Sequence, residues 1–363
     1  MSPGAIRHHI GQLLVAGFDG TTLPVELRAI AREFSLGGVI FFARNVEGPE
    51  QVAEVSAEAR ELVRDTPPWV SVDQEGGRVA RFKRPFTEWP PMLSLGRAQD
   101  EDLARRFARA LAAELRAVGV TLDFAPVLDI LTNPKNSVIG DRALGEEAAL
   151  VGRLGAAIAD ELQLGGVAAC GKHFPGHGDT IADSHHDLPL VQHPPDRLRA
   201  VEFEPFRAAV QAGVASLMVA HVLVPAFDEA RPSSLSPVVL RLIREELGFD
   251  GVVFTDDLEM RAVTDRHSIA DAAVQAIAAG CDAVLVCSGR ADLQAAALEA
   301  LVHAVEDERI PYARIEDALR RHRVMKDRFL AQPVPVRAAR PEWRTVVGRE
   351  AHAAVAAEMA RFL

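Results

Sequence analysis

The sequence predicts an α/β fold in which eight parallel strands close into a (β/α)8 barrel. Eight short apolar runs alternate with amphipathic segments whose apolar residues recur about every 3.6 residues. The runs lie at residues 13–18, 38–42, 69–72, 122–126, 167–171, 216–220, 252–255 and 283–287. Apolar strands that alternate with helices indicate a parallel sheet covered on both faces. Eight such units favour a single-domain TIM-type barrel over an open, doubly wound sheet.

Glycine, proline and serine mark the ends of the predicted helices. Helices are expected over 101–118, 148–164 and 236–247. In the last of these, Ser236 suits the N-cap, Pro237 the first helical position and Gly248 the position just past the end. Phrases such as AVGVTLDFAP and AAGCDAVLVCS place a glycine between a helix and the next strand. No GxGxxG motif follows the first run, so a dinucleotide-binding fold has no support.

The chain continues as helices beyond the eighth run. Two helical stretches, 293–306 and 314–329, precede a proline-containing link and a last helix near 344–362. We predict that residues 1–330 form the catalytic barrel. Residues 331–363 are then a C-terminal linker and helix packed on it, since so short a tail is too small for a second α/β domain.

Composition narrows the classes of function. The chain has 363 residues, 48% of them hydrophobic, and a net charge of −11. An acidic balance argues against nucleic acid or anionic membrane as the main partner. No run approaches the ~18 apolar residues of a membrane span, and the three cysteines lie in apolar runs, as buried thiols in a reducing compartment do. We expect a cytoplasmic monomer without a metal or other cofactor.

Polar residues follow the predicted strands closely. The set comprises Asp73, Arg81, Asp129, Arg142, Lys172, His173, His221, Asp256 and Asp257. In a (β/α)8 barrel these positions open onto one rim, where active sites lie. Cations and carboxylates converging there suit a polyhydroxylated ligand, because charged partners make strong hydrogen bonds to hydroxyls. The pattern therefore predicts an enzyme that acts on such a ligand.

Two stretches offer groups for bond cleavage. In VVFTDD, alternation lets only one of Asp256 and Asp257 point directly into the barrel mouth, and parity alone does not say which. The other carboxylate could cap the following helix. In GKHFPGHGDTIADSHHDLPL, Asp183 precedes His185 by two residues, and a carboxylate can orient a histidine that transfers protons.

Together these motifs resemble the signature of the family 3 glycoside hydrolases, specifically the bacterial β-N-acetylglucosaminidases of peptidoglycan recycling. The resemblance covers KHFPGHGDTIADSHHDLP, VDQEGGRVARF, LDFAPVLDI, IGDRALG, AHVLVPAFD and FTDDLEM. It implies a retaining exo-hydrolase that removes terminal N-acetylglucosamine from muropeptide fragments, with Asp256 as nucleophile and His185, supported by Asp183, as acid/base. The sugar-binding residues that it implies are Asp73, Arg81, Arg142, Lys172 and His173. This chain lacks the second α/β domain that many members carry.

Three alternatives remain open at this point. A metal-dependent hydrolase could use histidines and aspartates at strand ends, although no HxH follows the first run. A non-catalytic sugar-binding barrel would keep the rim without needing Asp256 together with the Asp183–His185 pair. A phosphorylase would transfer the sugar to phosphate on the same scaffold.

Overall fold

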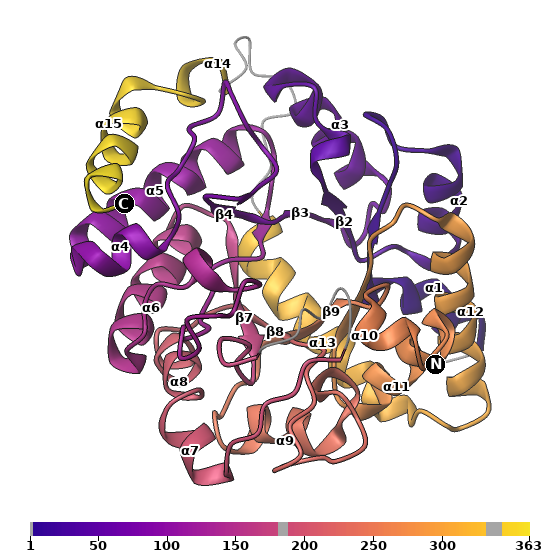
Figure 1. The fold of residues 1–363 in the computed structure, drawn as a ribbon. Coiled ribbons are helices and arrows are strands. Elements are labelled where there is room, and N and C mark those ends of the chain that lie inside the picture. The colour runs from indigo at the N-terminus through magenta and orange to yellow at the C-terminus, as the bar shows by residue number, and fades with distance from the viewer. Residues whose placement is uncertain (1–2, 181–187, 332–342) are drawn as a thin grey trace.

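Eight parallel strands close into a barrel in the computed structural model, which describes residues 3–180, 188–331 and 343–363 (Figure 1). The order around the barrel is β1-β10-β9-β8-β7-β6-β3-β2. These strands are β1 (Leu14–Gly17), β2 (Gly38–Phe41), β3 (Trp69–Val72), β6 (Leu122–Asp123), β7 (Ala168–Phe174), β8 (Ser216–Val219), β9 (Val252–Asp257) and β10 (Ala283–Val286). Each predicted run overlaps one barrel strand, so the (β/α)8 prediction is confirmed.

Helices surround the barrel, and a short hairpin of β4 (Gln74–Gly76) and β5 (Val79–Ala80) follows β3. The helices are α1 (Pro3–Ile10), α2 (Val25–Phe34), α3 (Pro49–Glu61), α4 (Leu93–Ala98), α5 (Glu101–Ala117), α6 (Ala148–Leu164), α7 (Pro195–Ala200), α8 (Glu204–Gln211), α9 (Pro237–Glu245), α10 (Arg261–Thr264), α11 (Ile269–Ala279), α12 (Ala291–Glu306), α13 (Tyr312–Leu330), α14 (Trp343–Val346) and α15 (Glu350–Met359). The predicted cap is present, because the Ser236 hydroxyl accepts a hydrogen bond from the amide of Val239.

Two strands end three residues away from the ends of their predicted runs. Strand β6 ends at Asp123, before the predicted end at Pro126, a residue that has no amide hydrogen to donate to a ladder. Strand β7 continues past Gly171 to Phe174, and its register against β8 shifts between these two residues. The residues after Gly171 therefore belong to the barrel wall and not to the following loop.

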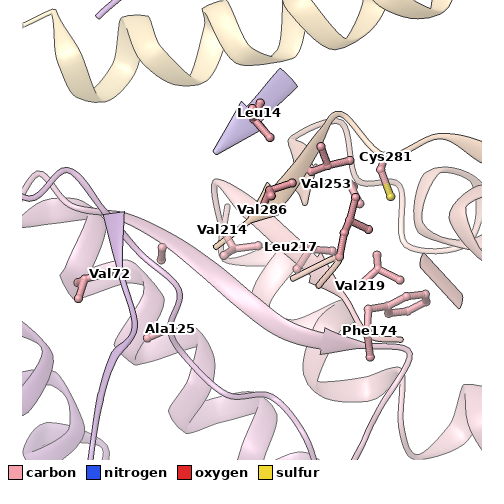
Figure 2. Packing of buried hydrophobic residues seen from close by; sticks show 14 of the residues in the cluster. Leu14, Val72, Ala125, Phe174, Val214, Leu217, Val219, Val253, Cys281 and Val286 are labelled. Carbon is pink, nitrogen blue, oxygen red and sulfur yellow. The ribbon is translucent and has the colours of Figure 1, made fainter. Parts of the chain in front are cut away.

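Alternation along the strands sorts their side chains into two apolar clusters. Residues facing outward join the cluster between the barrel and its helices. Figure 2 shows part of it, with Leu217 and Val219 of β8 close to Val253 of β9. Residues facing inward, such as Val252 and Phe254, fill the barrel interior.

Helix α13 completes the interior. It lies in the middle of the ring of helices in Figure 1, and its Met325, Phe329 and Leu330 belong to the interior cluster. The Nζ atom of buried Lys326 donates to Gln12 Oε1 at 2.7 Å and to the carbonyl of Gly37 at 3.0 Å. Helix α13 thus closes the end of the barrel where the strands begin.

A buried carboxylate is one of the groups that attach the C-terminal segment to the barrel. Helices α14 and α15 contact α5. The Glu114 side chain of α5 accepts hydrogen bonds from Thr87, from the amide of Gly348 at 2.9 Å and from His352 Nδ1 at 2.9 Å. Burial acts to raise the pKa of Glu114, but the hydrogen bonds from His352 and Thr87 outweigh it and hold the pKa below the usual value. The division of the chain at residue 330 stays a prediction.

We predict that Glu114→Leu lowers the free energy of unfolding by about 2–4 kcal/mol, because several buried donors lose their acceptor. The lowered folded-state pKa means that the carboxylate stabilises the fold above the usual glutamate pKa of 4.5 and loses this effect as pH falls. Urea unfolding at several pH values measures both. The control Glu358→Gln removes a partly exposed pair with Arg106 and should lower the free energy of unfolding far less, because solvent screens that pair. Equal losses in the two variants would contradict the prediction.

Candidate active site

A cavity of about 170 Å³ opens at the carboxyl ends of the strands. It is bordered by residues at the ends of β2, β3, β7, β9 and β10 and by the two loops that carry Arg81 and Arg142. Seven of the nine predicted rim residues line it, namely Asp73, Arg81, Arg142, Lys172, His173, Asp256 and Asp257, whereas Asp129 and His221 lie behind this lining. Asp183 and His185 lie outside the described residues.

The inward face of β9 carries Asp256. Val252 and Phe254 belong to the interior cluster, and Asp256, two residues further on, shares their face. Asp257 also borders the cavity, but its Oδ1 accepts a hydrogen bond from the amide of Glu259 at 3.1 Å, so the expectation that only one aspartate points directly into the mouth stays a prediction. The register between β9 and β10 shifts just before Asp257, which pairs with Leu285, and such an irregularity re-aims the side chains that follow it.

A buried ion network forms one wall of the cavity. Lys172 Nζ lies 2.8 Å from Asp73 Oδ1 and 2.6 Å from Glu75 Oε1. Arg142 binds both oxygens of Glu75, each at 2.8 Å, in the two-bond geometry typical of arginine and carboxylate. Arg81 Nη2 lies 3.2 Å from Asp73 Oδ2. The network joins β3, the β4–β5 hairpin, β7 and the loop after β6.

Glu75 is the member of this network that sequence reasoning did not single out. It lies in VDQEGG, two residues after Asp73, so alternation past β3 was the available signal. Burial acts to raise its pKa, but Arg142 and Lys172 outweigh burial and keep the pKa well below the usual glutamate value. Burial acts to lower the pKa of Lys172, but the carboxylates of Asp73 and Glu75 outweigh burial and raise this pKa above its usual value. The network is therefore charged across the physiological pH range.

Asp129 orients the histidine of the KH pair. Its Oδ2 lies 2.6 Å from His173 Nδ1, and its Oδ1 accepts the amide hydrogen of His177 at 2.6 Å. Asp129 is fully buried, and although burial acts to raise its pKa, His173 outweighs this and lowers it. Because Nδ1 is engaged by a carboxylate, Nε2 is the ring nitrogen of His173 that a ligand in the cavity would meet.

The two neighbouring aspartates of β9 have opposite pKa shifts. For Asp256, burial is outweighed by His173, His221 and the Asp257 amide, which lower the pKa. Burial raises the pKa of Asp257 to about 7, and the nearby carboxylates of Glu259 and Asp256 add to this. Asp256 is thus the carboxylate suited to act as an anion at neutral pH, since its environment favours the charged form.

His177 and Asp179, in the loop after β7, have separate partners. His177 Nδ1 lies 2.7 Å from Thr180 Oγ1, whereas Asp179 Oδ2 lies 2.6 Å from His193 Nε2. Within the described ranges, no group of three or more His, Cys, Asp or Glu side chains could hold a metal ion. In the same part of the chain, no helix is both long and apolar enough to cross a membrane.

Comparison with known proteins identifies the family. The glycosyl hydrolase family 3 N-terminal domain matches residues 5–325. A β-hexosaminidase of Nitrosomonas eutropha is 42% identical over 76% of this chain and 80% of its own length. One from Thiobacillus denitrificans is 44% identical over 76% and 78%.

Solved structures agree with this result. A family 3 β-N-acetylglucosaminidase from Paenibacillus is 41% identical with a TM-score of 0.93, covering 98% of this chain and 68% of that one. NagZ from Neisseria gonorrhoeae, in complex with N-trifluoroacetyl-D-glucosamine, is 34% identical with a TM-score of 0.78, covering 96% and 97%. The chain therefore belongs to glycosyl hydrolase family 3, as a glycoside hydrolase of the β-N-acetylhexosaminidase type.

Proposed function

We propose that this enzyme is a retaining exo-β-N-acetylglucosaminidase that releases terminal, non-reducing N-acetylglucosamine from fragments of peptidoglycan turnover. The observation that carries the proposal is an aspartate with a lowered pKa, Asp256, on the inward face of β9 beside a charged wall. A family 3 β-N-acetylglucosaminidase with the same fold supports the choice of sugar. The expected natural substrate is N-acetylglucosamine–anhydro-N-acetylmuramic acid, with or without its peptide.

In the proposed first step, a carboxylate oxygen of Asp256 attacks the anomeric carbon. The bond from that carbon to the leaving oxygen breaks, and the sugar becomes an ester of Asp256. His185, oriented by Asp183, donates a proton to the leaving oxygen. In the second step His185 removes a proton from water, which displaces Asp256 with a second inversion, so configuration is retained. A histidine here replaces the second carboxylate of most glycosidases.

The charged wall provides the proposed binding site for the sugar hydroxyls. Lys172, Arg142 and Arg81 offer donors, Asp73 offers acceptor oxygens, and His173 offers its Nε2. The network holds these groups in place before substrate arrives, since each is already paired. Preorganised charges need no rearrangement as positive charge develops on the sugar ring.

The proposal is tested by specificity. The enzyme should cleave aryl glycosides of β-N-acetylglucosamine with a higher kcat/KM than those of β-glucose or β-xylose, and should release N-acetylglucosamine from the anhydro-disaccharide. Analysing the products in phosphate and in phosphate-free buffer separates a hydrolase from a phosphorylase. A preference for β-glucose, or a sugar 1-phosphate as the main product, would contradict the proposal.

We predict that Asp256→Asn lowers kcat by about 10³-fold or more with the fold intact, because an amide cannot form the ester. Asp257→Asn is the matched control, since it changes the adjacent carboxyl and keeps the backbone. It should retain much more activity. Rates with an aryl N-acetylglucosaminide and thermal unfolding check both variants. An inactive Asp257→Asn beside an active Asp256→Asn would transfer the nucleophile role to Asp257.

We predict that Lys172→Ala and Arg142→Ala each lower kcat/KM, by a factor that corresponds to about 2–4 kcal/mol of lost transition-state stabilisation, because charged hydrogen bonds to the sugar are lost. Each change also leaves buried Glu75 with fewer partners, so thermal stability should fall as well. The control Arg105→Ala removes a pair with Asp160 on the outside of the barrel. Steady-state kinetics of the three variants should show a lowered kcat/KM in Lys172→Ala and Arg142→Ala and a nearly unchanged one in Arg105→Ala. Wild-type kcat/KM in both would refute the binding role.

We predict that His185→Gly slows the cleavage of poor leaving groups by about 10²–10⁴-fold and leaves the first step nearly unchanged for a very acidic phenol. The glycosyl-enzyme should then accumulate after a burst, because water has lost its base. Azide should restore turnover of the His185→Gly variant and give a β-glycosyl azide. Asp183→Ala should slow the same steps by a smaller factor. Equal slowing of all substrates, without burst or azide product, would make His185 a binding residue.

A further inference from the structure

His221 connects the end of β8 to the end of β9. It is fully buried and follows the strand by two residues. Its Nε2 lies 2.9 Å from the carbonyl oxygen of Asp257, and its Nδ1 lies 2.6 Å from Ser234 Oγ. A carbonyl oxygen only accepts, so Nε2 must carry the hydrogen. The hydroxyl of Ser234 can donate to Nδ1 or accept from it, so it supports this arrangement in either protonation state.

The backbone of Asp257 is held on both sides as a result. Its carbonyl accepts from His221, and the next amide, that of Leu258, donates to the carbonyl of Leu285 at 3.0 Å. The peptide group that follows Asp257 therefore has its plane fixed by β8 and β10. The amide of Asp257 itself donates to Asp256 Oδ1 at 2.8 Å. A continuous set of hydrogen bonds thus runs from Ser234 to the carboxylate of Asp256.

We propose that His221 is a positioning residue for the nucleophile. By fixing the backbone of Asp257, it keeps the Asp257 amide on Oδ1 of Asp256, so that Oδ2 faces the anomeric carbon. Among the residues that the structure describes, none makes a hydrogen bond to Oδ2. The inference rests on the proposed role of Asp256.

The arrangement has a defined use in both steps. When Oδ2 bonds to the anomeric carbon, Oδ1 becomes the ester carbonyl and still accepts the amide hydrogen. When water later displaces Asp256 from the anomeric carbon, the bonding electrons return to the carboxylate, and the same amide stabilises the charge. Small displacements of a reacting group lower rates steeply, by about 10²-fold for 1 Å. Fixing the carboxylate therefore matters for kcat more than for binding.

The charge state of Asp256 gives an independent readout. Several titratable groups face its carboxyl from the neighbouring elements. They are Lys172 and His173 of β7, His177 of the following loop, His221, Asp257 and Cys287. His221 and the Asp257 amide are among the groups that lower the pKa of Asp256. Losing His221 should therefore move the acid limb of kcat/KM to higher pH, a change that a purely structural histidine would not cause.

The decisive variants are His221→Gln and His221→Asn. A glutamine amide nitrogen reaches about as far as Nε2 and can donate to the carbonyl of Asp257, whereas an asparagine amide reaches only about as far as Nδ1. With an aryl N-acetylglucosaminide, we expect His221→Asn to lower kcat by about 10- to 10²-fold with KM changed less than about threefold. His221→Gln should recover most of that loss. His322→Leu is the control, because it removes another buried histidine, bonded to the carbonyl of Asp282.

The outcomes separate this inference from the proposed function. His322→Leu should lower thermal stability without moving the acid limb. Equal kcat in the Gln and Asn variants, or an acid limb that stays in place in His221→Asn, would overturn the positioning role. If either variant unfolds, Ser234→Ala is tested in its place, and its kcat should fall by a smaller factor than that expected for His221→Asn. An active Asp256→Asn variant would refute the role of Asp256 as nucleophile. An inactive Asp256→Asn variant, together with a His221→Asn variant whose kcat equals that of the wild type, would refute only this inference.

Discussion

The ammonium group of Lys172, held between the carboxylates of Asp73 and Glu75, is the interaction on which the cavity depends. Burying a charge is costly unless it is paired. Removing one partner of a buried pair is strongly destabilising, because it leaves the other charge buried and uncompensated. Here the charges are buried as a set, with Arg142 and Arg81 completing it. The segments that carry them come from separate parts of the chain, so the set fixes their relative positions. The same ion pairs that make the cavity wall charged thus connect the segments that form it.

Much of the architecture follows from patterns visible along the chain. Strand β3 matches its predicted run residue for residue, because a short apolar run between polar turns has few other interpretations. The rim residues around the cavity were predicted because parallel strands bring their ends together. Family membership was predicted from combined motifs, and the profile match over residues 5–325 confirms it. The individual roles of the rim residues stay predictions.

Several features of the site depend on details of pairing and hydrogen bonding that the sequence does not report. Asp257 borders the cavity next to a register shift between β9 and β10, and no residue pattern in VVFTDD reports that shift. Lys172 and His173, although adjacent, both line the cavity where β7 and β8 shift in the same way. Glu75 depends on the fold of a hairpin, and His221 on a bond to a backbone carbonyl. Strict alternation predicts the direction of side chains only while the ladder stays regular.

The position of α13 has a consequence for folding during synthesis of the chain. The barrel closes only when β10 meets β1, and its interior is completed by Met325, Phe329 and Leu330 near the end of the chain. On the ribosome, the inward faces of the early strands cannot be fully buried until nearly the whole chain has been synthesised. During that interval apolar surface is exposed to neighbouring chains, which is when aggregation competes with folding. A chain that stops short of α13 would keep that surface exposed permanently, so the protein's cellular yield depends on translation running past residue 330.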